Sequence, residues 1–223
     1  MAKTLAHSTA TAPGQRSFAT LKRYVVDYVQ GGDDPELLDI AGRALNKALD
    51  VLNATRQWIK MTGKQDIVTT LDAADYQLNK DFKDPIECVL MNLAQYPLAK
   101  LDYLPYQLLT IEVPDGTEAG APEAYTVYYQ ERLFSLSRAP AQGWVDTYPY
   151  MRLRYHQRLL HMENDGDVHG GPPEFDAFIS WRARFDVAAV RGETSLARLA
   201  HMESEGILAS LIRSDNEIFT DWS

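Results

Sequence analysis

The sequence has a single cysteine, Cys88, among its 223 residues. One thiol excludes a disulfide framework within the chain and is typical of a protein from a reducing compartment. Long apolar runs are also missing, since no stretch approaches the roughly 18 apolar residues of a membrane-spanning helix. Residues 1–17 lack the apolar core of a secretory signal. We therefore expect a cytosolic product that does not enter a membrane.

Nucleotide-binding motifs and an excess of basic charge are missing as well. Neither GxGxxG nor GxxxxGK[ST] occurs, which argues against the common phosphate-binding loops. Only 22 Lys and Arg stand against 31 Asp and Glu, a net charge of −9. This balance disfavours the phosphate neutralisation on which tight nucleic-acid binding depends. It still allows an acidic surface along which DNA slides without sticking.

What is present predicts an α+β fold. The chain is 45% hydrophobic and 24% charged, as expected for a globular protein with a buried core. Helical patterns lie at both ends of the chain, with β patterns between them. We expect the N- and C-terminal helices to form a helical bundle or hairpin with an inserted antiparallel β module. The expected segments are a flexible arm (1–17), a helical domain (18–60 with 172–213), a β-platform domain (64–160), a loop (161–171) and a C-terminal tail (214–223).

The first helices are marked by clear start and stop signals. A short helix from Phe18 to Val29 should end at Gly31 and Gly32. Asp34 and Pro35 then predict the start of an amphipathic helix that reaches about Trp58. Its apolar stripe should pack on the C-terminal helices and contains Leu37, Ala41, Leu45, Leu49 and Leu52.

The block from Asp66 to Leu160 is predicted to be β-rich. Short alternating runs, such as 126–129 and 151–155, are separated by Pro, Gly and Asp. Its tyrosines more often fill cross-strand pairs or subunit interfaces than stack nucleic-acid bases. Cys88 lies in an apolar strand pattern, so we expect a small buried side chain rather than a nucleophile.

A cluster of histidines and acids near residue 161 is the main candidate for a metal site. The residues are His156, His161, His169, Glu163, Asp165 and Asp167. Their spacing is irregular, and in an EF-hand alignment with Gly166 sixth, His161 falls first and Pro172 twelfth, where carboxylates are required. We expect a solvated loop here, and no catalytic, cofactor or metal residues in the chain.

Two further groups are candidates for contacts with partners. Arg152, Arg154 and Arg158 form the longest basic grouping, and Arg152 and Arg154 share one sheet face if their strand is regular. They are either a small positive patch for DNA or an acidic neighbour, or a solvated strand face. Beyond Arg213 no periodicity is left, yet the tail carries Ile218, Phe219 and Trp222. Disordered ends rarely hold such large apolar groups unless something buries them.

Taken in order, these features resemble the head-to-tail adaptor (connector) proteins of tailed bacteriophages, especially the tail tubular protein A type. Each motif is weak alone, and the specificity lies in their order over residues 34–213. Asn79 departs from the family's Leu-Pro-x-Asp-Phe turn, because it occupies the position of the turn proline. The segments that carry the resemblance are Ala44–Asn46 with Leu49–Leu52, the turn at Leu78–Glu87, Ala121–Tyr125, Leu136–Pro140 and the return strand Tyr150–Tyr155.

The resemblance implies a structural virion protein rather than an enzyme. It implies a ring of about twelve copies below the portal protein, at the neck between head and tail, which extends the DNA exit channel and receives the tail tube or nozzle protein. Double-stranded viral DNA would pass through transiently, and assembly would take place in the host cytoplasm. The resemblance also implies that the tail docks into the portal. The alternatives are another ring component, such as a tail terminator or baseplate part, and, more remotely, a small metal-dependent hydrolase.

Overall fold

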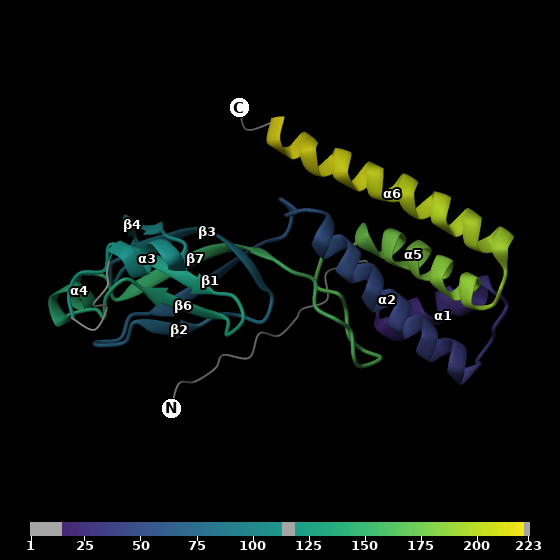
Figure 1. Cartoon of the computed structure of the whole chain (residues 1–223), viewed down its shortest axis with the longest axis horizontal. Helices are drawn as coiled ribbons and strands as arrows, with labels where there is room; N and C mark the ends of the chain where they lie inside the picture. Colours follow the sequence, from purple (N-terminus) through teal and green to yellow (C-terminus); the bar gives the residue numbers. More distant parts are fainter. Residues whose placement is uncertain (1–14, 113–118, 221–223) are drawn as a thin grey trace. The chain divides into compact units, whose positions relative to one another are not determined.

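The computed structural model describes residues 15–112 and 119–220, and within them the fold is mixed α and β, as predicted. These residues form six helices and a seven-stranded sheet. The chain divides into two compact units (Figure 1). The helical unit comprises Met1–Lys60 and Leu159–Ser223, and the β unit comprises Met61–Arg158.

The helical unit is built from four helices drawn from both ends of the chain. They are α1 (Phe18–Tyr28), α2 (Pro35–Thr55), α5 (Phe175–Val190) and α6 (Thr194–Thr220). Helix α5 contacts each of the other three (Figure 1). The start of α2 follows from its sequence, because Asp34 Oδ1 accepts hydrogen bonds from the N–H of Glu36 at 2.9 Å and of Leu37 at 3.4 Å.

The apolar stripe of α2 lies in the core of this unit. All five stripe residues are buried, and Ala41, Leu45, Leu49 and Leu52 have no exposed surface. Gly42 lets α1 approach α2 closely, since a Cβ at this position would lie 3.1 Å from the Phe18 ring. Burial of this kind is the main favourable contribution to folding.

Helix α6 is longer than the sequence predicted. We expected the helix to end near Arg213, but it continues to Thr220. Asp215 supplies the physical reason: its carboxylate is buried and accepts the N–H of Ile59 at 3.1 Å, while Arg56 Nη2 lies 3.3 Å away. These contacts tie the last turns of α6 to the end of α2, and most of the expected irregular tail is therefore helical.

The end of the expected flexible arm is held in place. Gln15 Nε2 donates to the carbonyl oxygen of Gly171 at 3.3 Å, and the Arg16 N–H donates to Asp176 Oδ2 at 3.0 Å. Ser17 caps α1 by accepting the N–H of Thr20 at 3.4 Å. The prediction of a flexible arm is thus wrong for residues 15–17, because long-range hydrogen bonds fix them; residues 1–14 lie outside the described part of the chain.

The β unit contains one continuous sheet in the order β1-β7-β3-β4-β5-β6-β2. The prediction of a wholly antiparallel module is wrong in one place, since β4 pairs with β5 in parallel. Residues 104–123 connect these two strands, which is long enough for the crossover that a parallel pair requires. The strands are β1 (Thr62–Val68), β2 (Asp75–Gln77), β3 (Phe82–Met91), β4 (Pro97–Tyr103), β5 (Ala124–Tyr128), β6 (Leu133–Leu136) and β7 (Tyr150–Gln157).

Two short helices occupy parts of the β block. Helix α3 (Tyr106–Glu112) and helix α4 (Gln142–Thr147) both lie within the block that the sequence predicted to be β-rich. Pro105 accounts for the first, because proline ends the strand and its carbonyl accepts the N–H of Leu109 at 3.0 Å. The Trp144 side chain accounts for the second, since it packs into the core of the unit.

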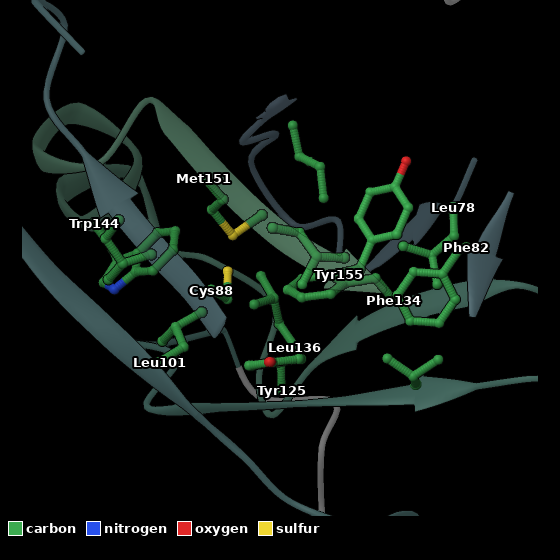
Figure 2. Packing of buried hydrophobic residues seen from close by; sticks show 14 residues of the cluster. Leu78, Phe82, Cys88, Leu101, Tyr125, Phe134, Leu136, Trp144, Met151 and Tyr155 are labelled. Carbon is green, nitrogen blue, oxygen red and sulfur yellow. The ribbon is translucent and has the colours of Figure 1, made fainter. Parts of the chain in front are cut away.

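One hydrophobic cluster fills the β unit, and Figure 2 shows its side chains converging from several strands. Along β7, Met151, Leu153 and Tyr155 point inward while Arg152 and Arg154 alternate with them on the other face. Cys88 lies in this cluster, and burial raises the pKa of its thiol to about 12. A protonated, enclosed thiol is a packing residue and not a nucleophile.

The two edge strands of the sheet are joined by a side chain. Gln65 on β1 donates from Nε2 to the carbonyl oxygen of Gln77 on β2 at 2.8 Å, and its Oε1 accepts the N–H of Asn79 at 3.0 Å. The side-chain amide thus makes both hydrogen bonds that a neighbouring strand would otherwise make. The sheet curls until its edges meet at Gln65, which protects exposed edge groups from pairing with other chains.

Candidate interaction surfaces

The loop of histidines and acids is a structural connection. His161 Nε2 lies 2.8 Å from Asp50 Oδ1, and Lys22 Nζ lies 2.6 Å from Asp165 Oδ1. Asp167 Oδ2 accepts the N–H groups of Asn164 and Glu163, which lowers the pKa of the Asp167 carboxyl. Across residues 15–112 and 119–220, no group of three or more His, Cys, Asp or Glu side chains is placed to hold a metal ion.

His169 holds the chain beside α5. Its Nε2 lies 2.7 Å from Asp176 Oδ1, and its Nδ1 accepts the N–H of Gly171 at 3.1 Å. Since Nδ1 is an acceptor, the proton resides on Nε2 and is donated to the carboxylate. Both residues are buried, so this hydrogen-bonded pair fixes the path of the loop into α5.

The predicted basic patch is neutralised by carboxylates on neighbouring strands. Arg152 bonds to both oxygens of Asp66 on β1, at 2.6 and 3.0 Å. This contact lowers the pKa of the Asp66 carboxyl and raises that of the arginine. The two side chains face each other because Asp66 and Arg152 are partners in the β1–β7 register. A bidentate pair of this kind leaves little free positive charge for a phosphate.

The other two arginines of the patch are engaged as well. Arg154 donates to Glu87 on β3 at 2.6 Å, and Lys100 on β4 also donates to Glu87. Both hydrogen bonds lower the pKa of Glu87, and the one from Lys100 has the larger effect. Arg158 lies apart and donates to the carbonyl oxygen of Lys80 at 2.9 Å. The structure therefore brings Arg152 and Arg154 to one face, as predicted, within a ladder of alternating charges.

The tyrosines serve mainly as packing residues. Tyr125 and Tyr155 are buried, and burial raises the pKa of Tyr155 to about 12. The Tyr155 hydroxyl donates to Asp81 Oδ1 at 3.0 Å. Tyr103 and Tyr129 close one end of the core, where their rings contact Tyr125 and Phe82. Their geometry is that of cross-strand packing, with part of each ring exposed.

The β3–β4 hairpin carries an exposed apolar tip that was not predicted from the sequence. The side chains of Leu93, Tyr96 and Leu98, which we call the hairpin tip, are 78%, 67% and 53% exposed. A three-residue loop carries the tip: the Gln95 N–H donates to Asn92 O at 2.9 Å, and Gln95 has a φ of 61°, which is typical of the left-handed position in such loops. Large apolar side chains displayed in this way mark contact surfaces.

The helical unit has a groove between α2 and α5. It has a volume of about 610 Å³. Its walls are aliphatic, from Ile40, Ala44, Ala189 and Val190, and its rim carries Arg43, Lys47 and Asp186. Val190 is 65% exposed. We call this feature the α2–α5 groove.

The predicted docking tail is described only in part. Its backbone is helical through Thr220, so Ile218 and Phe219 belong to α6. The side chains of these two residues, and the whole of Trp222, lie outside the part of the chain that the structure describes. Their contacts remain a prediction.

Comparison with known proteins adds no assignment. The sequence matches no protein-family model, and a search of curated proteins finds no match to it. Among the helices of the described residues, none combines the length and apolarity needed to cross a membrane. We therefore base the proposed function on the surfaces described above.

Proposed function

We propose that the protein is a structural, non-enzymatic head-to-tail adaptor of a tailed bacteriophage. In this role a ring of copies lies below the portal protein at the neck of the virion, extends the DNA exit channel and receives the tail tube or nozzle protein. By the family resemblance the ring contains about twelve copies. The finer architecture belongs to the same proposal: a helical bundle from both ends of the chain, with a β module inserted.

The observation that carries the proposal is the division of the chain into two units. The helical unit is assembled from residues on both sides of the β unit, so the β unit is an insertion with its own core. The resemblance to adaptors rests on this order of segments. The proposed ring also accounts for the large exposed apolar side chains on both units, since each protomer of a ring needs surfaces that contact its neighbours.

The charge distribution supports a channel that DNA passes without binding tightly. The basic residues of the β7 face are paired with Asp66 and Glu87, and the whole chain carries a net charge of −9. Tight binding of duplex DNA requires unpaired Lys and Arg at the phosphates. Replacing Arg152 and Arg154 with glutamine tests this: we expect normal DNA retention in particles, and loss of packaged DNA would contradict a passive wall.

The tail is proposed to dock into the portal through Ile218, Phe219 and Trp222. Deletion of residues 214–223 is a poor test, because it removes the buried Asp215 and destabilises the helical unit. Replacing Phe219 and Trp222 with alanine keeps Asp215 in place. We expect loss of attachment to co-expressed portal protein with an unchanged melting temperature. A lowered melting temperature with attachment intact would show that these side chains pack on their own chain.

A second ring component of the virion, such as a tail terminator or baseplate part, would share these properties. The two roles differ in the neighbour that is contacted. Crosslinking mass spectrometry on intact virions separates them: adaptor crosslinks must include the portal protein, whereas crosslinks to tail proteins alone would assign the chain to the tail.

A further inference from the structure

We propose that the hairpin tip of one copy docks into the α2–α5 groove of the next copy, so that the chain associates head to tail. The inference rests on the proposed function in one respect, because a ring requires a contact between two different surfaces that repeats from copy to copy. It goes further by naming the two surfaces, and it applies to copies of the chain in the absence of portal protein.

The hairpin tip has the properties of an inserting group. The run from Cys88 to Ala99 contains no charged residue and is the longest such run in residues 15–112 and 119–220. Leu93 is the most exposed of the large hydrophobic side chains described, at 78%. Hydrogen bonds across the loop, from Asn92 N to Tyr96 O at 3.1 Å and from Tyr96 N to Asn92 Oδ1 at 3.0 Å, define its shape before binding. A preformed loop loses little conformational entropy when it docks.

The groove has the complementary properties. Its volume of about 610 Å³ lies within the range of pockets that bind sizeable apolar groups. The charged side chains at the rim already form ion pairs within the chain. Arg43 Nη1 lies 2.6 Å from Asp39 Oδ2. Lys47 Nζ lies 3.1 Å from Asp186 Oδ2, an ion pair whose geometry is not that of a hydrogen bond. An uncharged occupant therefore covers the aliphatic walls without leaving a buried charge unpaired.

A second copy is the occupant that both surfaces favour. The tip lies on the β unit and the groove on the helical unit, so each copy carries one of each, and binding leaves a free tip and a free groove for further copies. A charged peptide would gain nothing from a groove whose rim is internally neutralised. A lipid surface would bind the tip and leave the groove empty, and the experiment below distinguishes this outcome from docking between copies.

Crosslinking between two full-length preparations tests the contact. One preparation carries Leu93→Cys and the other Val190→Cys; the native Cys88 is fully buried and does not interfere. Mixed under oxidising conditions without portal protein, they should give disulfide-linked dimers at least five-fold above either preparation alone. A mixture in which Thr147→Cys replaces Leu93→Cys is the control, because Thr147 is exposed elsewhere on the β unit. Crosslinking at the control level would overturn the proposal.

A second variant guards against chance collisions. Adding Tyr96→Asp to the Leu93→Cys preparation should abolish the excess crosslinking, whereas Leu199→Asp, on an exposed position of α6, should leave it unchanged. Equal effects of the two changes would contradict docking, and so would flotation of the native chain with phosphatidylcholine vesicles in place of crosslinking. Crosslinks without rings on the portal would refute the adaptor role alone, and rings without crosslinks would refute this contact alone.

Discussion

Replacing Asp215 with alanine should destabilise the helical unit, although the sequence places this residue in a polar tail. The Asp215 side chain is 2% exposed, and its carboxylate accepts the N–H of Ile59 at 3.1 Å and of Lys60 at 3.5 Å. Arg56 Nη2 lies 3.3 Å from its other oxygen, with the arginine side chain 24% exposed. The substitution leaves backbone donors and one cation without their acceptor.

The expected magnitude follows from these contacts. A buried donor left unpaired costs about 1–3 kcal/mol. Breaking a buried ion pair costs about 3–5 kcal/mol, which the partial exposure of Arg56 reduces. We therefore expect Asp215→Ala to lower the free energy of unfolding by about 2–4 kcal/mol, and Asp215→Asn, which keeps one acceptor oxygen, by roughly half as much.

Urea unfolding followed by circular dichroism at 222 nm measures the effect, and hydrogen exchange locates it. Exchange should increase at the last turns of α6 and at the amides of Ile59 and Lys60. Arg213→Ala is the matched control, since this residue is exposed on the same helix and should change the unfolding free energy by less than about 0.5 kcal/mol. An Asp215→Ala midpoint equal to that of the control would refute the structural account of α6.

Four further outcomes are expected. Leu45→Ala, in the α2 stripe, should cost about 2–5 kcal/mol in urea unfolding, and a cost below about 1 kcal/mol would mean that the stripe is not core. Gly63→Ala should destabilise the β unit, because its Cβ would lie 2.8 Å from the Tyr155 ring; an unchanged melting temperature would contradict this. Cys88 should not react with a thiol reagent at pH 8 until urea unfolds the chain, given its pKa of about 12, and rapid labelling of native protein would disagree. The pKa of Asp66 is lowered in the folded protein, so its contribution to folding stability is present above the ordinary carboxyl pKa and is lost as pH falls through the folded pKa. Asp66→Asn should therefore reduce the drop in melting temperature between pH 6 and pH 3. An unaltered drop would exclude this carboxylate as a source of the acid sensitivity.

The elements that the sequence predicted well are those with local signals. Asp34 and Pro35 set the start of α2, and alternation along β7 separates Leu153 from Arg152, because capping and pleat periodicity depend only on neighbouring residues. The extension of α6 was missed, since Asp215 is held by residues about 156 positions away in the chain. Such long-range contacts leave no periodic trace.

The candidate surfaces likewise divide into features that local sequence patterns predict and features that depend on long-range contacts. The shared face of Arg152 and Arg154 follows from strand geometry, but their neutralisation by Asp66 and Glu87 depends on strand register, which a single sequence does not reveal. The hairpin tip was missed because an uncharged run such as that from Cys88 to Ala99 is expected to be buried. Its lack of charge was the available signal, and only the structure places part of the run at a turn.

Electron microscopy of the protein co-expressed with the portal protein from the same genome tests the adaptor role most directly. We expect a closed ring of copies seated on the portal, with a continuous channel along the ring axis. Portal particles without added density, under conditions where both proteins are soluble and folded, would contradict the proposed function.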